Sequence, residues 1–89
     1  MHLEFDPAKN AANVRKHGVD FDDAKLVLFD LRALVREDQE AKEEQRFVAV
    51  GADALGRVLT VVYTYREPDT IRLISARLGT KRERQAYEA

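Results

Sequence analysis

The sequence predicts a single α+β domain over residues 1–89, with two N-terminal helices, a four-stranded antiparallel sheet and a short C-terminal helix. Three observations lead to this prediction. A chain of 89 residues has the length of one domain. Capping signals mark the start of each helix, and after the second helix the apolar residues fall into short runs typical of strands. Short turns between the last three runs favour antiparallel pairing, and the helices must cover at least one face of the sheet.

The first helix should extend from Pro7 to about His17. Asp6 can accept a hydrogen bond from a free amide at the helix start, and proline suits the first helical position. Gly18 can adopt the left-handed conformation that ends a helix. Helical spacing divides the segment into two faces. The small apolar face holds Ala8, Ala11, Ala12 and Val14, and the polar face holds Lys9, Asn13, Lys16 and His17.

Two further helices are indicated by the same kind of signal. The second should begin at Asp20 and cover Phe21 to about Phe29, with an apolar stripe formed by Phe21, Ala24, Val27 and Leu28. The last should begin at Thr80, because Thr80 and Glu83 have the spacing of a capping box.

Four strands are predicted between these helices, at residues 33–36, 47–50, 58–65 and 70–76. The run from Val58 to Tyr65 is the longest stretch of β-branched and aromatic residues, so we expect it to be the central strand. The acidic segment 38–44 separates the first two strands as a polar loop. The segments 53–56 and 67–69 contain the glycine, proline and aspartate residues of tight turns.

Composition excludes several classes of protein. The absence of cysteine rules out disulfides, a cysteine nucleophile and a zinc site with cysteine ligands. No apolar stretch approaches the ~18 residues of a membrane span. The N-terminal residues also lack the basic start and apolar run of a signal peptide, so we expect a soluble, cytoplasmic protein.

The formal net charge of −1 conceals an uneven distribution of charge. Residues 20–45 carry nine acidic and four basic side chains, whereas residues 57–89 carry six arginines and one lysine against four acids. A basic C-terminal third could bind a nucleic acid locally. The alternative is that these charges only solvate a small surface.

The C-terminal residues contain side chains suited to phosphodiester chemistry. Arginine grips a phosphate through two parallel hydrogen bonds and keeps its charge, and a tyrosine can move a proton or stack on a base. Arg77 ends the last strand, and Glu83, Arg84 and Tyr87 share one face of the last helix. Arg66 ends the neighbouring strand. The structural alternative is that Tyr87 packs its ring against the sheet, that Glu83 caps its helix and that Arg72 covers apolar surface.

Two other polar sets contain side chains that could carry chemistry or bind a partner. His17 could transfer protons near neutral pH, but Lys16 and His17 also lie where cations stabilise a helix C-terminus. The acidic residues Glu37, Asp38, Glu40, Glu43 and Glu44 match no metal-binding loop, so we expect a solvated loop or a contact with a basic partner. No metal or other cofactor is predicted.

Several segments, in order and over nearly the whole chain, resemble the BrnT family, the toxin half of a bacterial type II toxin–antitoxin pair. The N-terminal segments are Phe5-Asp6, Lys9-Asn10, Asn13, Lys16-His17-Gly18-Val19 and Phe21, and the C-terminal ones are residues 62–64, 71–77 and Glu83-Arg84 through Tyr87. The family usually has tryptophan where this chain has Phe5, which should alter packing rather than chemistry.

The resemblance implies a RelE-like fold and a ribonuclease that arrests translation. It also implies a ribbon-helix-helix antitoxin (BrnA-like) that blocks the RNA surface and carries the complex to its promoter DNA, in a complex of two toxins and two antitoxins. We therefore expect a metal-independent endoribonuclease. Arg77 would bind the scissile phosphate, Tyr87 would orient or protonate the cleaved bond, and His17 or Glu83 would act as general base. Lys16, Arg66, Arg72 and Arg84 would bind RNA. The alternative is a module of the same fold that binds RNA or an antitoxin without cleavage.

Overall fold

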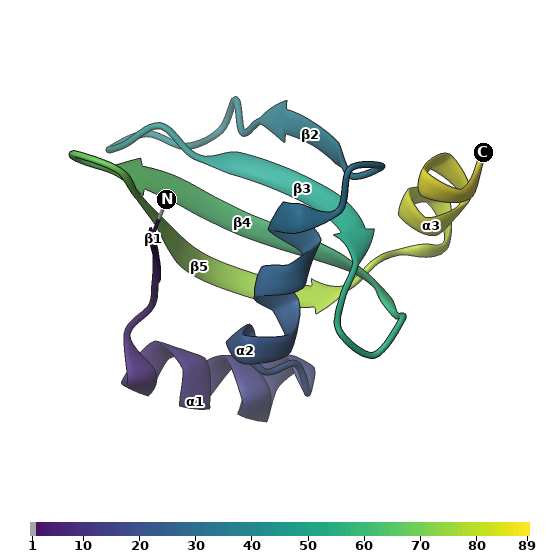
Figure 1. Cartoon of the computed structure of the whole chain (residues 1–89), viewed down its shortest axis with the longest axis horizontal. Coiled ribbons are helices and arrows are strands. Elements are labelled where there is room, and N and C mark those ends of the chain that lie inside the picture. The colour runs from purple at the N-terminus through teal and green to yellow at the C-terminus, as the bar shows by residue number, and fades with distance from the viewer. Residues whose placement is uncertain (1) are drawn as a thin grey trace.

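The computed structural model describes residues 2–89, which form three α-helices, one 3₁₀-helix and one sheet (Figure 1). The first elements are β1 (His2–Glu4), α1 (Pro7–His17), α2 (Phe21–Ala24) and the 3₁₀-helix η1 (Lys25–Phe29). They are followed by β2 (Leu34–Glu37), β3 (Phe47–Ala52), β4 (Val58–Arg66), β5 (Thr70–Leu78) and α3 (Lys81–Glu88). The predicted α+β class is confirmed.

The sheet has five strands in the order β1-β5-β4-β3-β2. The four predicted strands pair in antiparallel fashion, with β4 inside the sheet as expected. The prediction of a purely antiparallel, four-stranded sheet was nevertheless wrong, because β1 adds a fifth strand parallel to β5, with Leu3 opposite Ile71. A strand of three residues whose partner lies near the other end of the chain leaves no local signal in the sequence.

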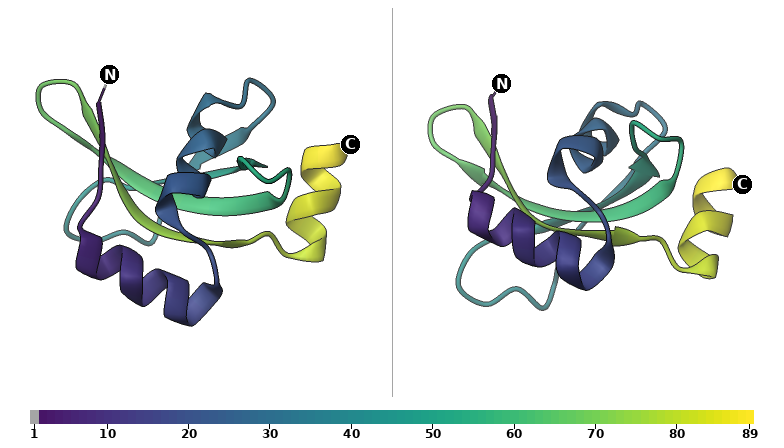
Figure 2. Two further views of the ribbon diagram at one scale, coloured as in Figure 1. Left: turned by 60° about the horizontal axis from the view of Figure 1, so that its bottom comes forward. Right: turned by 90° about the horizontal axis from the view of Figure 1, so that it is seen from below.

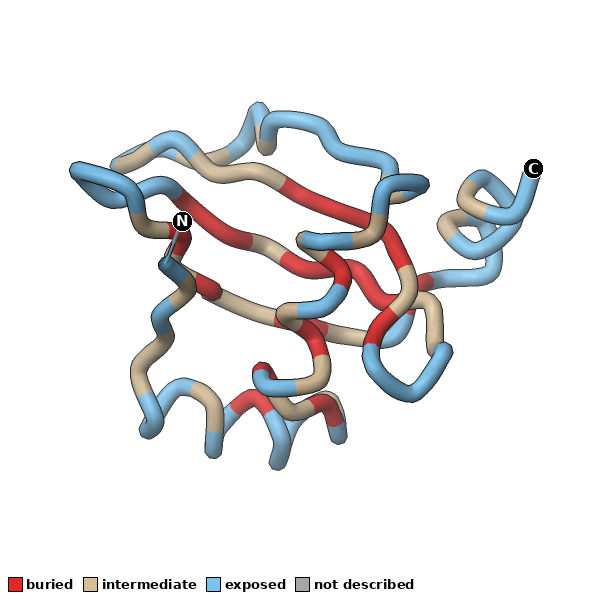
Figure 3. Tube along the Cα trace, in the orientation of Figure 1, coloured by how far each residue is buried: buried red, intermediate tan, exposed pale blue. Residues whose placement is uncertain are grey.

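α2 and η1 lie across one face of the sheet, and α1 runs along the outer edge of β5 (Figures 1 and 2). Alternate strand residues meet these helices, and the buried positions follow the middle of the strands (Figure 3). The core consists of Val19, Phe21, Ala24, Val27, Ala49, Leu59, Val61, Tyr63, Ile71, Leu73 and Ala76. No helix lies across the opposite face, which we call the open face, and α3 stands at the end of the sheet where β5 stops (Figure 2).

The second predicted helix is α-helical only from Phe21 to Ala24 and continues as the 3₁₀-helix η1 to Phe29. Local signals placed its ends correctly. The Asp20 side chain accepts a hydrogen bond from the Asp22 amide at its start. Gly18 has a φ of 70° and ends α1 as predicted.

α1 contacts the sheet through amide side chains rather than through its small apolar face. Asn13 is only 7% exposed, whereas Ala8, Ala11, Ala12 and Val14 are exposed. The Asn13 amide donates to the carbonyls of Val19 (2.9 Å) and Ala76 (2.8 Å) and accepts from the Ala76 amide (3.1 Å). It thus satisfies the backbone of β5 beyond the end of β1, on the edge of the strand that faces away from β4.

We predict that Asn13→Ala lowers the free energy of unfolding by about 3 kcal/mol, because it leaves buried backbone groups of Val19 and Ala76 without partners. Urea denaturation followed by circular dichroism measures the change. Lys9→Ala, at an exposed position of the same helix, is the control and should change stability little. Equal stabilities for the two variants would contradict this role of Asn13.

Candidate functional site

The open face carries two rows of side chains that cross the sheet at the end near α3. Register pairs align Leu34, Val50, Thr60 and Arg77 in the first row. The second row aligns Arg36, Val48, Val62 and Ser75. The rows therefore bring arginines of β2 and β5 to one surface, with aliphatic and hydroxyl side chains between them.

Arg77 binds Glu83 with both ends of its guanidinium. Nη1 donates to Oε1 at 2.8 Å and Nη2 donates to Oε2 at 3.2 Å. Glu83 also completes the predicted capping box, because its Oε1 accepts from the Thr80 amide at 2.8 Å while its own amide donates to Thr80 Oγ1 at 3.1 Å. The Glu83 carboxylate thus caps the N-terminus of α3 and links that helix to Arg77 at the end of β5.

These contacts keep Glu83 ionised. The hydrogen bonds from Arg77, with a smaller contribution from the Thr80 amide, outweigh partial burial and lower the pKa of Glu83 to about 2. A carboxylate with so low a pKa is a weak proton acceptor at neutral pH. The Arg77 side chain remains 41% exposed, so the guanidinium can still reach a ligand on the open face.

Tyr87 lies one turn beyond Glu83 on α3 and donates a short hydrogen bond to Asp30, which follows η1. Asp30 also accepts from the amides of Ala52 and Arg32, both at 2.9 Å. The bond to Asp30 raises the pKa of Tyr87, and the three donors together lower the pKa of Asp30. The phenol therefore stays protonated and the carboxylate charged. Within residues 2–89 no hydrogen bond joins Arg77 to Tyr87. The two are linked only indirectly, because Arg77 binds Glu83 on α3 and Tyr87 lies on the same helix.

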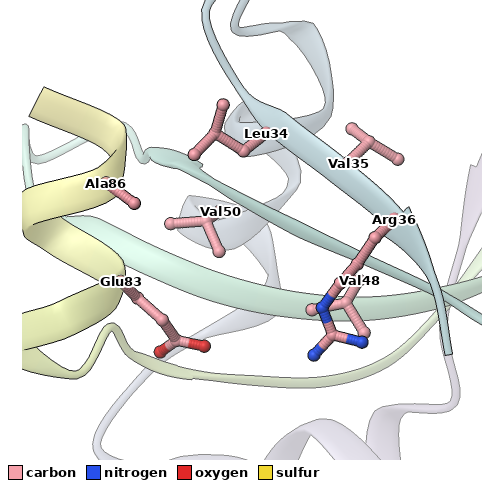
Figure 4. Close-up of a pocket in the computed structure, with 7 residues that line it drawn as sticks. All are labelled: Leu34, Val35, Arg36, Val48, Val50, Glu83 and Ala86. Atoms are coloured by element: carbon pink, nitrogen blue, oxygen red, sulfur yellow. The ribbon is translucent and has the colours of Figure 1, made fainter. Parts of the chain in front are cut away.

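A cavity of about 190 Å³ lies between α3, β2 and β3 on the open face. Its lining residues are Leu34, Val35, Arg36, Val48, Val50, Glu83 and Ala86. Figure 4 shows the Glu83 carboxylate and the Arg36 guanidinium on two sides of the cavity, with Val50 between α3 and β2. Among the described residues, Arg36 has no acidic partner. The cavity therefore presents both charges beside aliphatic side chains.

Three of the predicted RNA-binding arginines already have partners in the protein. Arg66 pairs with Glu44 at 2.7 Å, and Arg72 pairs with Glu4 on β1. Arg84 donates to the Gly79 carbonyl at 3.2 Å. The Glu44 contact also shows that the acidic loop meets a basic segment of this same chain.

Lys16 and His17 lie in the last turn of α1, where Lys16 is exposed and His17 is half-buried. Among residues 2–89, neither forms an ion pair or a side-chain hydrogen bond with the Arg77–Glu83 pair. Both lie in the last turn of α1, the position from which basic side chains can stabilise a helix C-terminus. Whether they contact RNA stays a prediction.

Sequence reasoning missed Arg36 as a member of the open face and Asp30 as the partner of Tyr87. Arg36 ends a predicted strand, but only the register of β2 with β3 places it beside Val48 on the open face. Asp30 follows the second predicted helix. Because Asp30 and Tyr87 are 57 positions apart in the sequence, no local pattern predicts their contact.

No set of three or more histidine, cysteine, aspartate or glutamate side chains that could hold a metal ion occurs within residues 2–89. In the same part of the chain, none of the helices is long and apolar enough to span a membrane.

Comparison with known proteins adds an independent finding. The family described as the ribonuclease toxin BrnT of type II toxin–antitoxin systems matches residues 5–83. The crystal structure of the Brucella abortus ribonuclease toxin BrnT is similar, with a TM-score of 0.70 and 28% sequence identity over 91% of this chain and 99% of that chain. No curated protein sequence matches this chain.

The low pKa of Glu83 predicts a pH-dependent contribution to stability. Its folded pKa of about 2 lies below the ordinary value of 4.5, so the stabilisation is complete above about pH 4.5 and is lost as the pH falls toward 2. Because Arg77 is partly exposed, we expect Glu83→Gln to cost about 1–2 kcal/mol at pH 7 and almost nothing at pH 2. Thermal denaturation between pH 2 and 7 measures this. Glu88→Gln on the same helix is the control, and a Glu83→Gln effect that is independent of pH would contradict the prediction.

Proposed function

This chain belongs to the BrnT family of ribonuclease toxins of type II toxin–antitoxin systems, and we therefore propose that it cleaves RNA internally without a metal ion. The observation that supports this most directly is the partly exposed Arg77 guanidinium, oriented by Glu83 on a sheet face that no helix covers. A fixed cation at that position can bind a phosphodiester and stabilise the extra charge of its transition state.

Metal-free cleavage of RNA uses the 2′-hydroxyl of the substrate as nucleophile. The 2′-oxygen loses its proton to a base and bonds to phosphorus, and the bond from phosphorus to the 5′-oxygen breaks. The products are a cyclic 2′,3′-phosphate and a 5′-hydroxyl that receives a proton from an acid. The protein must therefore supply one proton acceptor, one proton donor and a stabiliser of negative charge.

We assign these roles as follows. Arg77 holds the scissile phosphate. Glu83 orients Arg77 and is too weakly basic to be the proton acceptor that sequence reasoning kept as an alternative. His17, at the end of α1, is the proposed base. Tyr87 is the proposed donor after RNA replaces Asp30 as its partner, because a phenol is protonated at neutral pH with or without that contact.

The remaining basic side chains would bind the RNA backbone. Lys16 is exposed and has no acidic partner among residues 2–89. Arg66 and Arg72 would exchange a carboxylate for a phosphate, and Arg84 would contact RNA next to Gly79. Such contacts position the substrate and carry no sequence information.

The family implies an antitoxin partner. We propose that this antitoxin is a BrnA-like ribbon-helix-helix protein, that two copies of each protein form the complex, and that promoter DNA is bound only through the antitoxin. Its segment over the arginines should be acidic or apolar, because it must neutralise them. Released in the cytoplasm, the toxin would inhibit translation by cutting RNA.

One observation favours a second candidate, a module that binds RNA or antitoxin without cleavage. Arg77 and Tyr87 both bind carboxylates of their own chain and do not contact one another. If RNA cannot displace these carboxylates, the open face would bind a partner without reaching a catalytic arrangement.

We predict that the purified protein cleaves single-stranded RNA in EDTA and that Arg77→Ala lowers the rate by about 100-fold or more, since it removes the charge that stabilises the transition state. Gel analysis of a labelled RNA measures the rate. Arg82→Ala, an exposed arginine of α3 without an acidic partner among the described residues, should retain near-normal cleavage. Intact RNA after incubation with folded wild-type protein would favour the binding module.

We predict that His17→Gln and Tyr87→Phe each lower the single-turnover cleavage rate by about 10²-fold or more, which is what one proton-transfer group typically contributes. Affinity for an RNA whose 2′-hydroxyl is blocked should change little. His2→Gln and Tyr65→Phe, both at exposed positions, are matched controls. If Tyr87→Phe reduces only the stability of the fold, Tyr87 is an anchor of α3 rather than a proton donor.

A further inference from the structure

The cavity between α3, β2 and β3 has the properties of a base-binding site. We propose that it holds one guanine base of the RNA, next to the phosphate on Arg77, an inference that rests on the proposed cleavage of RNA. Arg36 and Glu83 supply the polar groups, and the other five lining residues are apolar: Leu34, Val35, Val48, Val50 and Ala86. The sequence placed Glu83 and Arg77 together but gave no indication of the cavity itself.

The size of the cavity suits a single planar ring system. Its volume is about 190 Å³, and an apolar cavity of about 150 Å³ is enough to admit a benzene ring. The aliphatic side chains can pack against the two faces of a base, and removing these apolar surfaces from water favours binding. The sugar and phosphate would remain outside, on the open face.

The polar groups favour guanine over the other bases. Arg36 has no acidic partner among residues 2–89, so its parallel N–H groups are available. Guanine presents two neighbouring acceptors, O6 and N7, to which arginine binds with two hydrogen bonds, whereas adenine presents a donor beside N7. Uracil lacks two neighbouring acceptors, and cytosine offers its pair, O2 and N3, on a single six-membered ring that would fill less of the cavity.

Glu83 adds a matching acceptor on the other side of the cavity. A carboxylate has about four lone-pair sites. Arg77 uses one on each oxygen and the Thr80 amide uses a second on Oε1, so a guanine N–H would compete for the remaining site on Oε2 with the Thr60 hydroxyl, which also interacts with this carboxylate. That site can accept from the N1 or N2 hydrogen of guanine while Arg36 donates to the opposite edge.

The same carboxylate places the base close to the reacting phosphate. Glu83 lines the cavity and binds Arg77, so a base in the cavity and a phosphate on Arg77 would belong to the same or to adjacent nucleotides. Arg36 would thus be a specificity-determining residue, whereas Arg77 acts on the reaction itself.

The first test uses nucleotides that the protein cannot cleave. The wild-type protein is titrated with guanosine, adenosine, cytidine or uridine 3′-monophosphate, and with inorganic phosphate, while the methyl signals of Leu34, Val48 and Val50 are followed by NMR. We expect the guanosine nucleotide to shift these signals and to bind about tenfold more tightly than the adenosine nucleotide. The inference is overturned if no nucleotide shifts them, if inorganic phosphate does so equally, or if the four nucleotides bind alike.

The second test alters the cavity without touching the proposed catalytic groups. Arg36→Ala should abolish the tenfold preference for guanosine over adenosine 3′-monophosphate. Ala86→Leu fills the cavity from an exposed position of α3 and should weaken guanosine binding by about tenfold or more. Gln85→Leu, the adjacent exposed position that does not line the cavity, is the matched control and should bind as wild type. Unaltered guanosine binding by both cavity variants overturns the inference.

Cleavage mapping separates this inference from the proposed activity. On an RNA of mixed sequence, the wild type should cut mainly beside guanines, and Arg36→Ala should spread the cuts over other bases. Cutting without a guanine preference overturns the base site and leaves the nuclease intact. Guanosine binding in a protein that cuts no RNA supports the base site and removes the nuclease. If the cavity variants lose only antitoxin binding, the cavity is a protein-docking site and the inference fails.

Discussion

The position of α3 depends on two polar contacts, and the candidate site depends on the position of α3. This helix buries none of its residues, so apolar packing does little to hold it. Arg77 binds Glu83 at its first turn, and Asp30 binds Tyr87 near its end. Two attachments fix both the location and the direction of a short helix. These two contacts therefore also determine where the Glu83 carboxylate lies and how α3 shapes the cavity beside it.

Local signals predicted the fold where each element is specified by its own residues. Asp6, Gly18 and the Thr80–Glu83 pair set helix ends through contacts a few positions apart, and all three hold in the structure. The failures arise where distant segments meet. β1 forms only because residues 2–4 pair with the distant strand β5, with Leu3 opposite Ile71. Asn13, on the predicted polar face of α1, is buried because its amide completes the hydrogen bonding of Ala76, a contact that hydrophobic spacing does not predict.

In the candidate site too, the sequence predicted the residues that lie close together in the chain and missed those that distant segments contribute. Glu83 and Arg77 lie six positions apart, and sequence reasoning identified both, although it could not tell a base from a positioning group. The low pKa of Glu83 follows from the guanidinium geometry and not from the residue types. The register of β2 with β3 is what places Arg36 on the open face. Asp30 belongs to the site only because Tyr87, on α3, binds it. A sequence supplies the candidates for such a site but not the distances between them.

The pairing of arginines with carboxylates offers a physical reason why a protein of nearly neutral charge can bind RNA at one place. Arg66, Arg72 and Arg77 each have an acidic partner, which suppresses long-range attraction to any polyanion. The partly exposed Arg66–Glu44 and Arg72–Glu4 pairs contribute little to stability, so a phosphate can replace the carboxylate there at small cost. Arg77 is partly exposed and can bind a phosphate while it stays paired with Glu83, so α3 need not detach. Binding then requires a ligand that fits the open face, because charge alone does not attract it.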